Sequence, residues 1–339
     1  MSSSSERPIA NVPYRPIACG DPVELAGELA DWNFEFTPLR PGEFAAKGGI
    51  VEFESALISR ITFDQPLVQR GHSPRGTVAV FIPGRGSNQV FLRGHELEPG
   101  QCITMADGGC VDAITKERYV DISLAVDRSV WDAHSDWLTP CPLATSNGTR
   151  VENIGQLWMQ RMHATVDWIF AAVDQHPHAL ARPDVQSSLR DQFLAAMADF
   201  GSAQQKVERR TRKVHARQRI AVERAREYIR AKLSEPLRLS ELCTYAHVQQ
   251  RSLEYGFREI TGLSPIAYVK TLRLNAVHQI LCGSEPSDRS ISEIAMDHGL
   301  WHLSQFAADY RRFFGETPTT TRKRVLAMRS ASYSPALCR

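Results

Sequence analysis

Two segments of the chain repeat one short pattern, and this duplication restricts the possible folds more than any other feature. Residues 239–265 read LSELCTYAHVQQRSLEYGFREITGLSP, and residues 291–318 read ISEIAMDHGLWHLSQFAADYRRFFGETP. Six positions match between the copies: Leu239, Leu242, Leu253, Phe257, Gly262 and Pro265 correspond to Ile291, Ile294, Phe306, Tyr310, Gly315 and Pro318. Two copies are too few for a solenoid, so the pattern predicts a small helical unit that occurs twice.

Each copy has the spacing of a helix-turn-helix unit. We expect first helices at Leu239–Ala246 and Ile291–His298, and second helices at Gln249–Ile260 and His302–Phe314. Gly299 suits the positive φ of the turn between the helices, and His247 takes that place in the first copy. Ser290 and Glu293 predict a capping box at the start of the second copy.

A longer helix is expected between the two units. Ser264 and Pro265 form a helix-start signal, and the helix would extend to about Cys282. Its length would be roughly 27 Å at 1.5 Å per residue. Successive major-groove segments on one face of DNA are roughly 34 Å apart. One rigid helix of this length could therefore hold the two units in neighbouring grooves.

The second helix of each unit has an apolar and a polar face. Leu253, Phe257, Phe306, Tyr310 and Phe313 recur at helical spacing and are expected to be buried. Side chains that can match base edges or neutralise phosphates lie opposite, and we expect DNA contacts from Gln249, Gln250, Arg251, Glu254, Tyr255, Arg258, His302, Ser304, Gln305, Arg311 and Arg312. For a single copy, a plain helical bundle with a solvated face would be an equal alternative.

The charge distribution supports a polyanionic partner for this part of the chain. Residues 201–329 contain 23 Lys and Arg against 13 Asp and Glu, whereas residues 1–200 contain 16 against 25. Phosphate neutralisation supplies most of the affinity for nucleic acid, so the acidic half is not expected to bind DNA. The Arg-rich segment 201–218 is interpreted as a charged linker, with a direct DNA contact as the less favoured reading.

Residues 1–200 follow a different pattern. Short β-rich runs separated by Gly and Pro turns over about 33–130 predict an antiparallel barrel or sandwich, and helical spacing follows over about 150–200. The fold class is therefore α+β, with an N-terminal β domain carrying flanking helices and an all-α C-terminal domain at 219–329. A wide apolar stripe in residues 151–173 predicts a dimer interface, and packing onto the chain's own β domain is the alternative.

Residues 219–325 resemble the DNA-binding domain of the AraC/XylS family, most closely in IAMDHGLWHLSQFAADYRRFFGETP. The resemblance implies a transcription regulator, often an activator, whose two units read two major-groove segments. The contacting residues it implies are Arg251, Glu254, Tyr255, Ser304, Gln305 and Ala308. Glu254 and Tyr255 replace the Gln and Arg common in the family, and Ala308 cannot hydrogen-bond a base. The layout upstream is similar to the family's cupin-like barrel with dimerising helices, which implies a homodimer and a contact with RNA polymerase.

Several arginines lie beside glycines in the N-terminal half. Arg40, Arg70, Arg75 and Arg85 occur in or next to predicted turns, where such side chains can bind a carboxylate or phosphate. They are the candidate site for a small-molecule effector, and an anionic effector would suit their charge, although solubilising turn residues are the commoner explanation. A β domain that responds to a protein partner instead of a small molecule is the second hypothesis.

No catalytic site, metal site or cofactor is expected. A cupin metal centre would have to use His72, His95 and Glu96, which lack the usual His-x-His spacing. An enzyme fused to a DNA-binding domain is therefore the third and weakest hypothesis.

The seven cysteines are scattered and never spaced as CxxC, and residues 1–8 (MSSSSERP) have no apolar stretch. We expect a cytoplasmic, nucleoid-associated protein without a membrane segment.

Overall fold

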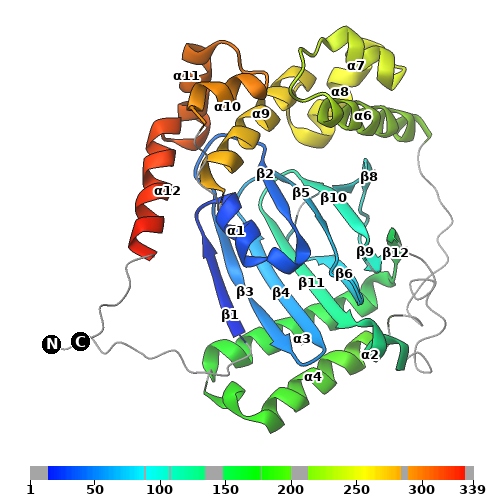
Figure 1. Ribbon diagram of the computed structural model, residues 1–339. Helices are drawn as coiled ribbons and strands as arrows, with labels where there is room; N and C mark the ends of the chain where they lie inside the picture. The colour runs from blue at the N-terminus through cyan, green and yellow to red at the C-terminus, as the bar shows by residue number, and fades with distance from the viewer. Residues whose placement is uncertain are drawn as a thin grey trace, which may run out of the picture.

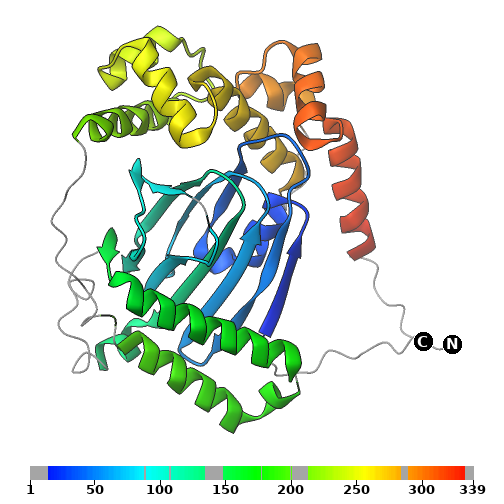
Figure 2. The same ribbon diagram turned by 180° about the vertical axis from the view of Figure 1, so that it is seen from behind.

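The computed structural model describes residues 14–87, 89–106, 108–133, 148–176, 178–198, 200, 213–283 and 289–332. Its elements are arranged in layers, with a helix pair, two β-sheets and a C-terminal group of helices following one another (Figure 1). This arrangement places the C-terminal helices on the opposite side of the sheets from the helix pair (Figure 2).

Two antiparallel sheets form the centre of the molecule. The seven-stranded sheet has the order β1 (Tyr14–Cys19), β3 (Ala46–Phe53), β4 (Ala56–Phe63), β11 (Tyr119–Asp127), β6 (Thr77–Pro83), β9 (Gln101–Ala106) and β12 (Gly148–Asn153). The five-stranded sheet has the order β2 (Glu35–Pro38), β5 (Leu67–His72), β10 (Cys110–Thr115), β7 (Val90–Leu92) and β8 (His95–Glu96). Neither sheet closes on itself, so the antiparallel β architecture is confirmed but a closed cupin-like barrel is not.

The period-two alternation of the strands separates two cores. On β6, Ala79 and Phe81 pack between the two sheets, whereas Val78, Val80 and Ile82 pack on the outer face of the seven-stranded sheet. Successive side chains of a strand point to opposite faces, which explains the division. Both faces of this sheet are covered, and its strands are accordingly apolar on both sides.

The helix pair α3 (Gly155–Gln175) and α4 (Pro183–Ala198) covers the outer face of the seven-stranded sheet, together with α2 (Arg128–Ala133) and the short 3₁₀ helix η3 (Ala179–Ala181). The apolar stripe of α3 lies in this core, where Met162 and Ile169 are fully buried. Our prediction that this stripe forms a dimer interface is therefore wrong for these residues, because the chain's own sheet and α4 cover them.

The C-terminal part consists of α6 (Lys213–Ala231), α7 (Leu239–Ala246), α8 (Gln250–Thr261), α9 (Pro265–Cys282), α10 (Ile291–Asp297), α11 (Leu303–Phe314) and α12 (Pro318–Ser332). Helix α6 begins inside the segment that we interpreted as a linker, of which residues 201–212 lie outside the described residues. Among the described helices, none combines the length and the apolar character that crossing a bilayer requires.

A candidate nucleic-acid interface on two helix-turn-helix units

Helices α7 and α8 form the first unit, joined by a tight turn. His247 at the turn has φ 55°, in the left-handed region that glycine adopts more readily. The carboxylate of Glu241 accepts from the backbone N–H of Arg238, 3.3 Å away, which caps the start of α7. Leu253 and Phe257 of α8 are fully buried, as their spacing predicted.

Helices α10 and α11 form the second unit in the same way. Ser290 and Glu293 make the predicted capping box, with the Ser290 N–H donating to Glu293 at 2.7 Å and the Glu293 N–H donating to Ser290 Oγ at 3.1 Å. Gly299 occupies the turn with φ 73°. The buried face of α11 carries Phe306, Tyr310 and Phe313.

Helix α9 joins the units, and its bounds are those expected from the sequence. Ser264 caps it by accepting from the Ala267 N–H at 3.3 Å. Arg273 of α9 donates three hydrogen bonds to main-chain carbonyl oxygens. Two go to residues just after α6, Leu233 at 2.9 Å and Glu235 at 2.5 Å. The third goes to Gly299 in the second unit, at 3.0 Å. A methyl group on Gly299 would approach the Arg273 guanidinium to 2.7 Å. The turn glycine thus makes room for the arginine that ties α9 to the loop between α6 and α7 and to the turn of the second unit.

The residues expected to contact DNA lie on the solvent side of both second helices. Glu254 is half-buried, and the others are exposed: Gln249, Gln250, Arg251, Tyr255, Arg258, His302, Ser304, Gln305, Arg311 and Arg312. Ala308, implied by the family resemblance alone, is exposed as well. The two polar faces therefore form two solvent-facing surfaces on a helical frame that is fixed by α9.

Some of these side chains already have partners within their helix. Gln250 donates to Glu254 at 2.8 Å, and Gln305 donates to Asp309 at 3.0 Å. Asp309 is buried and also pairs with Arg312 and with Lys270 of α9. Burial opposes its ionisation, but the bonds from Lys270 and Gln305 dominate and hold the pKa of Asp309 below its usual value.

Sequence reasoning missed the arginine that fixes the spacing of the units and the aromatic ring beside it. Arg273 lies over the ring of Trp301 at 5.6 Å, and Trp301 remains 47 % exposed immediately before α11. Trp301 directly precedes His302 and could not be singled out from the sequence, because single exposed aromatic side chains are common on protein surfaces. Nothing in the spacing of Arg273 indicated that it would reach main-chain atoms of the loop between α6 and α7 and of the second unit.

The helical part is attached to the five-stranded sheet by a shared core. Val68, Ile114 and Phe91 lie side by side on three neighbouring strands and pack against α6 to α9. At the centre of this seam, Arg226 of α6 is fully buried and pairs with Asp112 of β10 at 2.6 Å. Arg230 reaches the other oxygen of Asp112, also at 2.6 Å.

The charges at this seam balance one another. Burial by itself would raise the pKa of Asp112, but Arg226 and Arg230 outweigh it and keep this pKa below its usual value. Arg226 also contacts Glu223 at 2.5 Å and the Tyr268 hydroxyl at 3.2 Å. A second ion pair, Arg219 with Glu96 at 2.7 Å, joins α6 to β8. Each of these charged side chains, of which Arg226 and Asp112 are buried, thus has a partner of opposite charge.

The four candidate effector arginines are exposed and lie on separate segments. Arg40 follows β2, Arg70 lies on β5, Arg75 lies between β5 and β6, and Arg85 follows β6. Of these, Arg85 lines a cavity of about 560 Å³ between the β6–β7 loop, the β8–β9 loop and α3. The polar and charged side chains of the cavity wall include Glu96, His163 and Gln160.

Comparisons with known proteins agree with this geometry. A family model described as a helix-turn-helix domain matches residues 242–324. The XylDLEGF operon transcriptional activator of Pseudomonas putida is 25 % identical over 73 % of this chain and 78 % of its own length. The HTH-type transcriptional regulator GbdR of Pseudomonas aeruginosa is 36 % identical over 27 % of this chain and 24 % of its own.

Among solved structures, a probable AraC family transcriptional regulator from Rhodopseudomonas palustris is 33 % identical, with a TM-score of 0.29; the match covers 31 % of this chain and 96 % of that one. The helix-turn-helix match falls on the duplicated units, and the similarity to an operon activator extends well beyond them. The resemblance that the sequence indicated is confirmed: the helix-turn-helix match and the similarity to the operon activator identify an AraC/XylS-type DNA-binding transcriptional regulator.

Proposed function

We propose that this regulator reads a specific DNA sequence with the exposed faces of α8 and α11, under the control of a small-molecule effector bound in the N-terminal half. One observation carries the first part: two polar helix faces are exposed on a frame in which Arg273 bonds to the main chain on both sides of α9. A fixed spacing lets two helices enter successive major-groove segments of double-stranded DNA.

Arg251 and Gln305 are the proposed base readers. Arg251 is exposed near the start of α8, and an arginine there can make a bidentate contact with guanine. Gln305 occupies the corresponding part of α11. Its amide can contact adenine once its hydrogen bond to Asp309 is broken. The other exposed side chains of the two helices would position the protein on the phosphates.

The test is operator binding by the full chain, with the operator selected from random duplexes. Arg251→Ala and Gln305→Ala should each weaken binding by about 1–3 kcal/mol and relax the base preference at positions about one helical turn apart. Lys47→Ala, on an exposed strand position of β3, is the control and should bind as the parent does. If both helix variants keep the parent's preference at every position, the base readers lie elsewhere.

For the effector, we propose the cavity that Arg85 lines. Glu96 belongs to the same cavity wall and pairs with Arg219 of α6, so a ligand that displaces Glu96 would act directly on the attachment of the helical part. Arg85 offers charge for an anionic ligand, and its exposed partner Asp167, 3.4 Å away, can be displaced. This short route from cavity to α6 supports the proposal.

A thermal-shift screen of the full chain against small carboxylates tests this cavity. A bound compound should raise the melting temperature; Arg85→Ala should reduce that shift, and Arg75→Ala, outside the cavity wall, should keep it. A shift lost in Arg75→Ala instead would move the site to the β5–β6 turn. Stabilisation by a co-purifying protein, with no effect of any small molecule, would favour control by a protein partner.

We also propose that the chain acts as a homodimeric activator that contacts RNA polymerase. The relative named as an operon activator supports the activation.

For dimerisation, the outer side of α3 leaves Leu157 72 % and Trp168 46 % exposed. These residues, unlike Met162 and Ile169, can be changed to charged ones without entering the core, and Trp168→Glu should give a folded monomer in sedimentation.

A further inference from the structure

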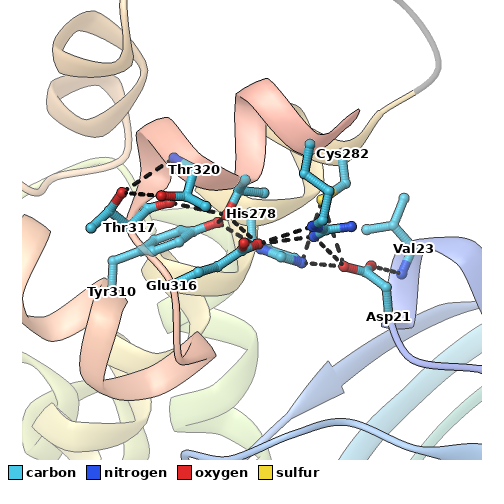
Figure 3. A network of polar contacts seen from close by, with 10 residues as sticks. Asp21, Val23, His278, Cys282, Tyr310, Glu316, Thr317 and Thr320 are labelled. Carbon is cyan, nitrogen blue, oxygen red and sulfur yellow. Dashed lines mark hydrogen bonds and ion pairs between the residues drawn. The ribbon is translucent and has the colours of Figure 1, made fainter. Parts of the chain in front are cut away.

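Three side chains that offer different metal-ligand atoms, an oxygen, a nitrogen and a sulfur, lie close together where the start of α1 meets α9 (Figure 3). Asp21 is the N-terminal cap of α1 (Pro22–Glu28), and its Oδ1 accepts from the Val23 N–H at 2.8 Å. The other oxygen, Oδ2, lies 2.8 Å from His278 Nε2. Cys282, one helical turn after His278, places its sulfur 3.5 Å from Nε2 and 3.7 Å from Oδ2.

The surrounding hydrogen bonds determine which nitrogen of His278 carries a proton. Thr321 Oγ1 donates to the Glu316 carboxylate at 2.8 Å, so it must accept from the Tyr310 hydroxyl at 3.0 Å. The Tyr310 oxygen in turn accepts from His278 Nδ1 at 2.7 Å. Nδ1 is therefore protonated, and the neutral ring directs the lone pair of Nε2 at the Asp21 carboxylate. A lone pair and an anion this close need a cation between them: a proton or a metal ion.

We propose that Asp21, His278 and Cys282 form a binding site for a divalent transition-metal ion of the zinc type. Carboxylate oxygen, imidazole nitrogen and thiolate sulfur are all zinc ligands, and ligand atoms around tetrahedral zinc lie roughly 3–4 Å apart. The three separations here, 2.8, 3.5 and 3.7 Å, need shifts of only a few tenths of an ångström. The Tyr310 bond to Nδ1 is the outer contact that commonly orients a ligating histidine.

An ion has a way in and room for a fourth ligand. Asp21 and His278 line a cavity of about 280 Å³ at the seam, whose wall includes Gly42, Glu43, Phe314 and Arg324. Arg324 opposes cation binding, since it lies 3.7 Å from Asp21, but it is closer to Glu316, at 2.9 Å, which balances its charge. Solvent in the cavity would complete the coordination, and the thiol proton would be released to it.

A metal ion here would link parts of the molecule that are remote in sequence. Asp21 belongs to the N-terminal half, and His278 and Cys282 belong to the helix between the two DNA-reading units. The same network continues through Tyr310 of α11 to Thr321 of α12 (Figure 3). Metal binding would therefore strengthen the contact between the N-terminal half and the second unit, independently of how DNA is read.

The test uses the full chain, stripped of metal by a chelator and titrated with Co²⁺ as a spectroscopic probe. The expected result is one ion per chain with a thiolate-to-cobalt charge-transfer band, and displacement by Zn²⁺. Cys282→Ser should abolish the band, whereas Cys243→Ser, a half-buried cysteine of α7, should retain it. Asp21→Asn keeps a good helix cap and should weaken Co²⁺ binding by at least about tenfold.

Melting curves of the metal-free variants show whether each is folded, so loss of binding is not confused with loss of structure. Three outcomes would overturn the proposal: no stoichiometric Co²⁺ binding by the parent, a charge-transfer band that survives in Cys282→Ser, or equal loss in Cys243→Ser. In each case the cation between Nε2 and Oδ2 is a proton, and the three residues form an ion pair beside a thiol.

Discussion

The two helix-turn-helix units have the same design but are attached to the rest of the molecule differently. The first shares one apolar core with the five-stranded sheet, through Val68, Phe91 and Ile114, and the buried ion pair of Arg226 and Asp112 lies at its centre. Among the described residues, the buried core of the second comes from α9, α10 and α11. Its hydrogen bonds with the N-terminal half include one from the Gly42 N–H to the Phe313 carbonyl, at 3.1 Å.

This difference shows which contacts can change without unfolding. Separating the first unit from the sheet would expose a continuous apolar surface and leave buried charges without partners, which is costly. Separating the second unit would exchange hydrogen bonds for bonds to water, at a small net cost for each. We therefore expect the first unit to behave as part of the sheet domain and the second to be the more adjustable.

The largest expected effect comes from removing Arg226. Its substitution by Ala leaves Asp112 and Glu223 buried with one fewer cation, and breaking such a buried pair destabilises by about 3–5 kcal/mol. Chemical denaturation of the full chain measures this loss. Arg224→Ala, on the exposed side of the same helix, is the matched control and should lie within about 0.5 kcal/mol of the parent.

If Arg226→Ala and Arg224→Ala had the same stability, the first unit would not be attached through this ion pair. The comparison between the units would then rest on the apolar core alone. A loss in Arg226→Ala that is accompanied by a second, separate unfolding transition would show that the helical part had come away from the sheet.

An intermediate effect is expected at the turns, where the units can be compared position by position. Gly299→Ala would force φ 73° on a residue with a side chain and push against Arg273, at a cost of about 1–3 kcal/mol. Gly315→Ala is the control, because its φ is similar, 78°, and nothing lies within 4 Å of the added methyl group. The excess loss in Gly299→Ala measures the Arg273 contact.

The first unit should respond in the opposite direction. His247 holds φ 55°, so His247→Gly relieves a backbone strain of about 1–2 kcal/mol. The freedom that glycine gains in the unfolded chain offsets about 0.5–1 kcal/mol of this. We expect the melting temperature to stay the same or rise slightly. A clear fall would mean that the His247 side chain makes a contribution that outweighs the strain.

The smallest effect concerns phosphate contacts at the end of α11. Arg311 is exposed and makes no ion pair with the described residues, whereas Arg312 pairs with Asp309. Arg311→Ala should therefore lower the salt dependence of DNA binding by about one unit of slope, with base preference unchanged. Arg312→Ala should lower it by less, because part of its charge already faces Asp309. A salt titration on operator and random duplexes distinguishes them.

Local signals in the sequence predicted the helical part well. The bounds of α7 and α9 agree with those expected. For α9, Ser264 and Pro265 mark a helix start that needs no tertiary information. The β-rich region was predicted as a whole, from about residue 33 to 130, and β5, β9 and β10 were not specified within it. They carry buried polar residues, such as Gln69, Thr104 and Asp112, that interrupt the apolar pattern, and their partners are supplied by distant parts of the chain.

The candidate site divides in the same way. The exposed faces of α8 and α11 follow from helical spacing, and their placement agrees with the sequence. The seam does not follow from any spacing, because Arg226 and Asp112 are 114 residues apart, and Asp21 and His278 are 257 apart. From the sequence alone, each of these residues would be interpreted as an ordinary surface charge, because its partner is known only from the three-dimensional structure.

Arg273 has a consequence for how such a regulator can diversify. All three of its hydrogen bonds end on main-chain oxygens, which every amino acid supplies, so residues 233, 235 and 299 present the same acceptor whatever side chain they carry. The attachment of α9 to the α6–α7 loop and to the turn of the second unit is thus largely insensitive to mutation at these acceptor positions. Under the proposed function, substitutions in α8 and α11 would change the DNA sequence that is bound, while this attachment of α9 stays the same.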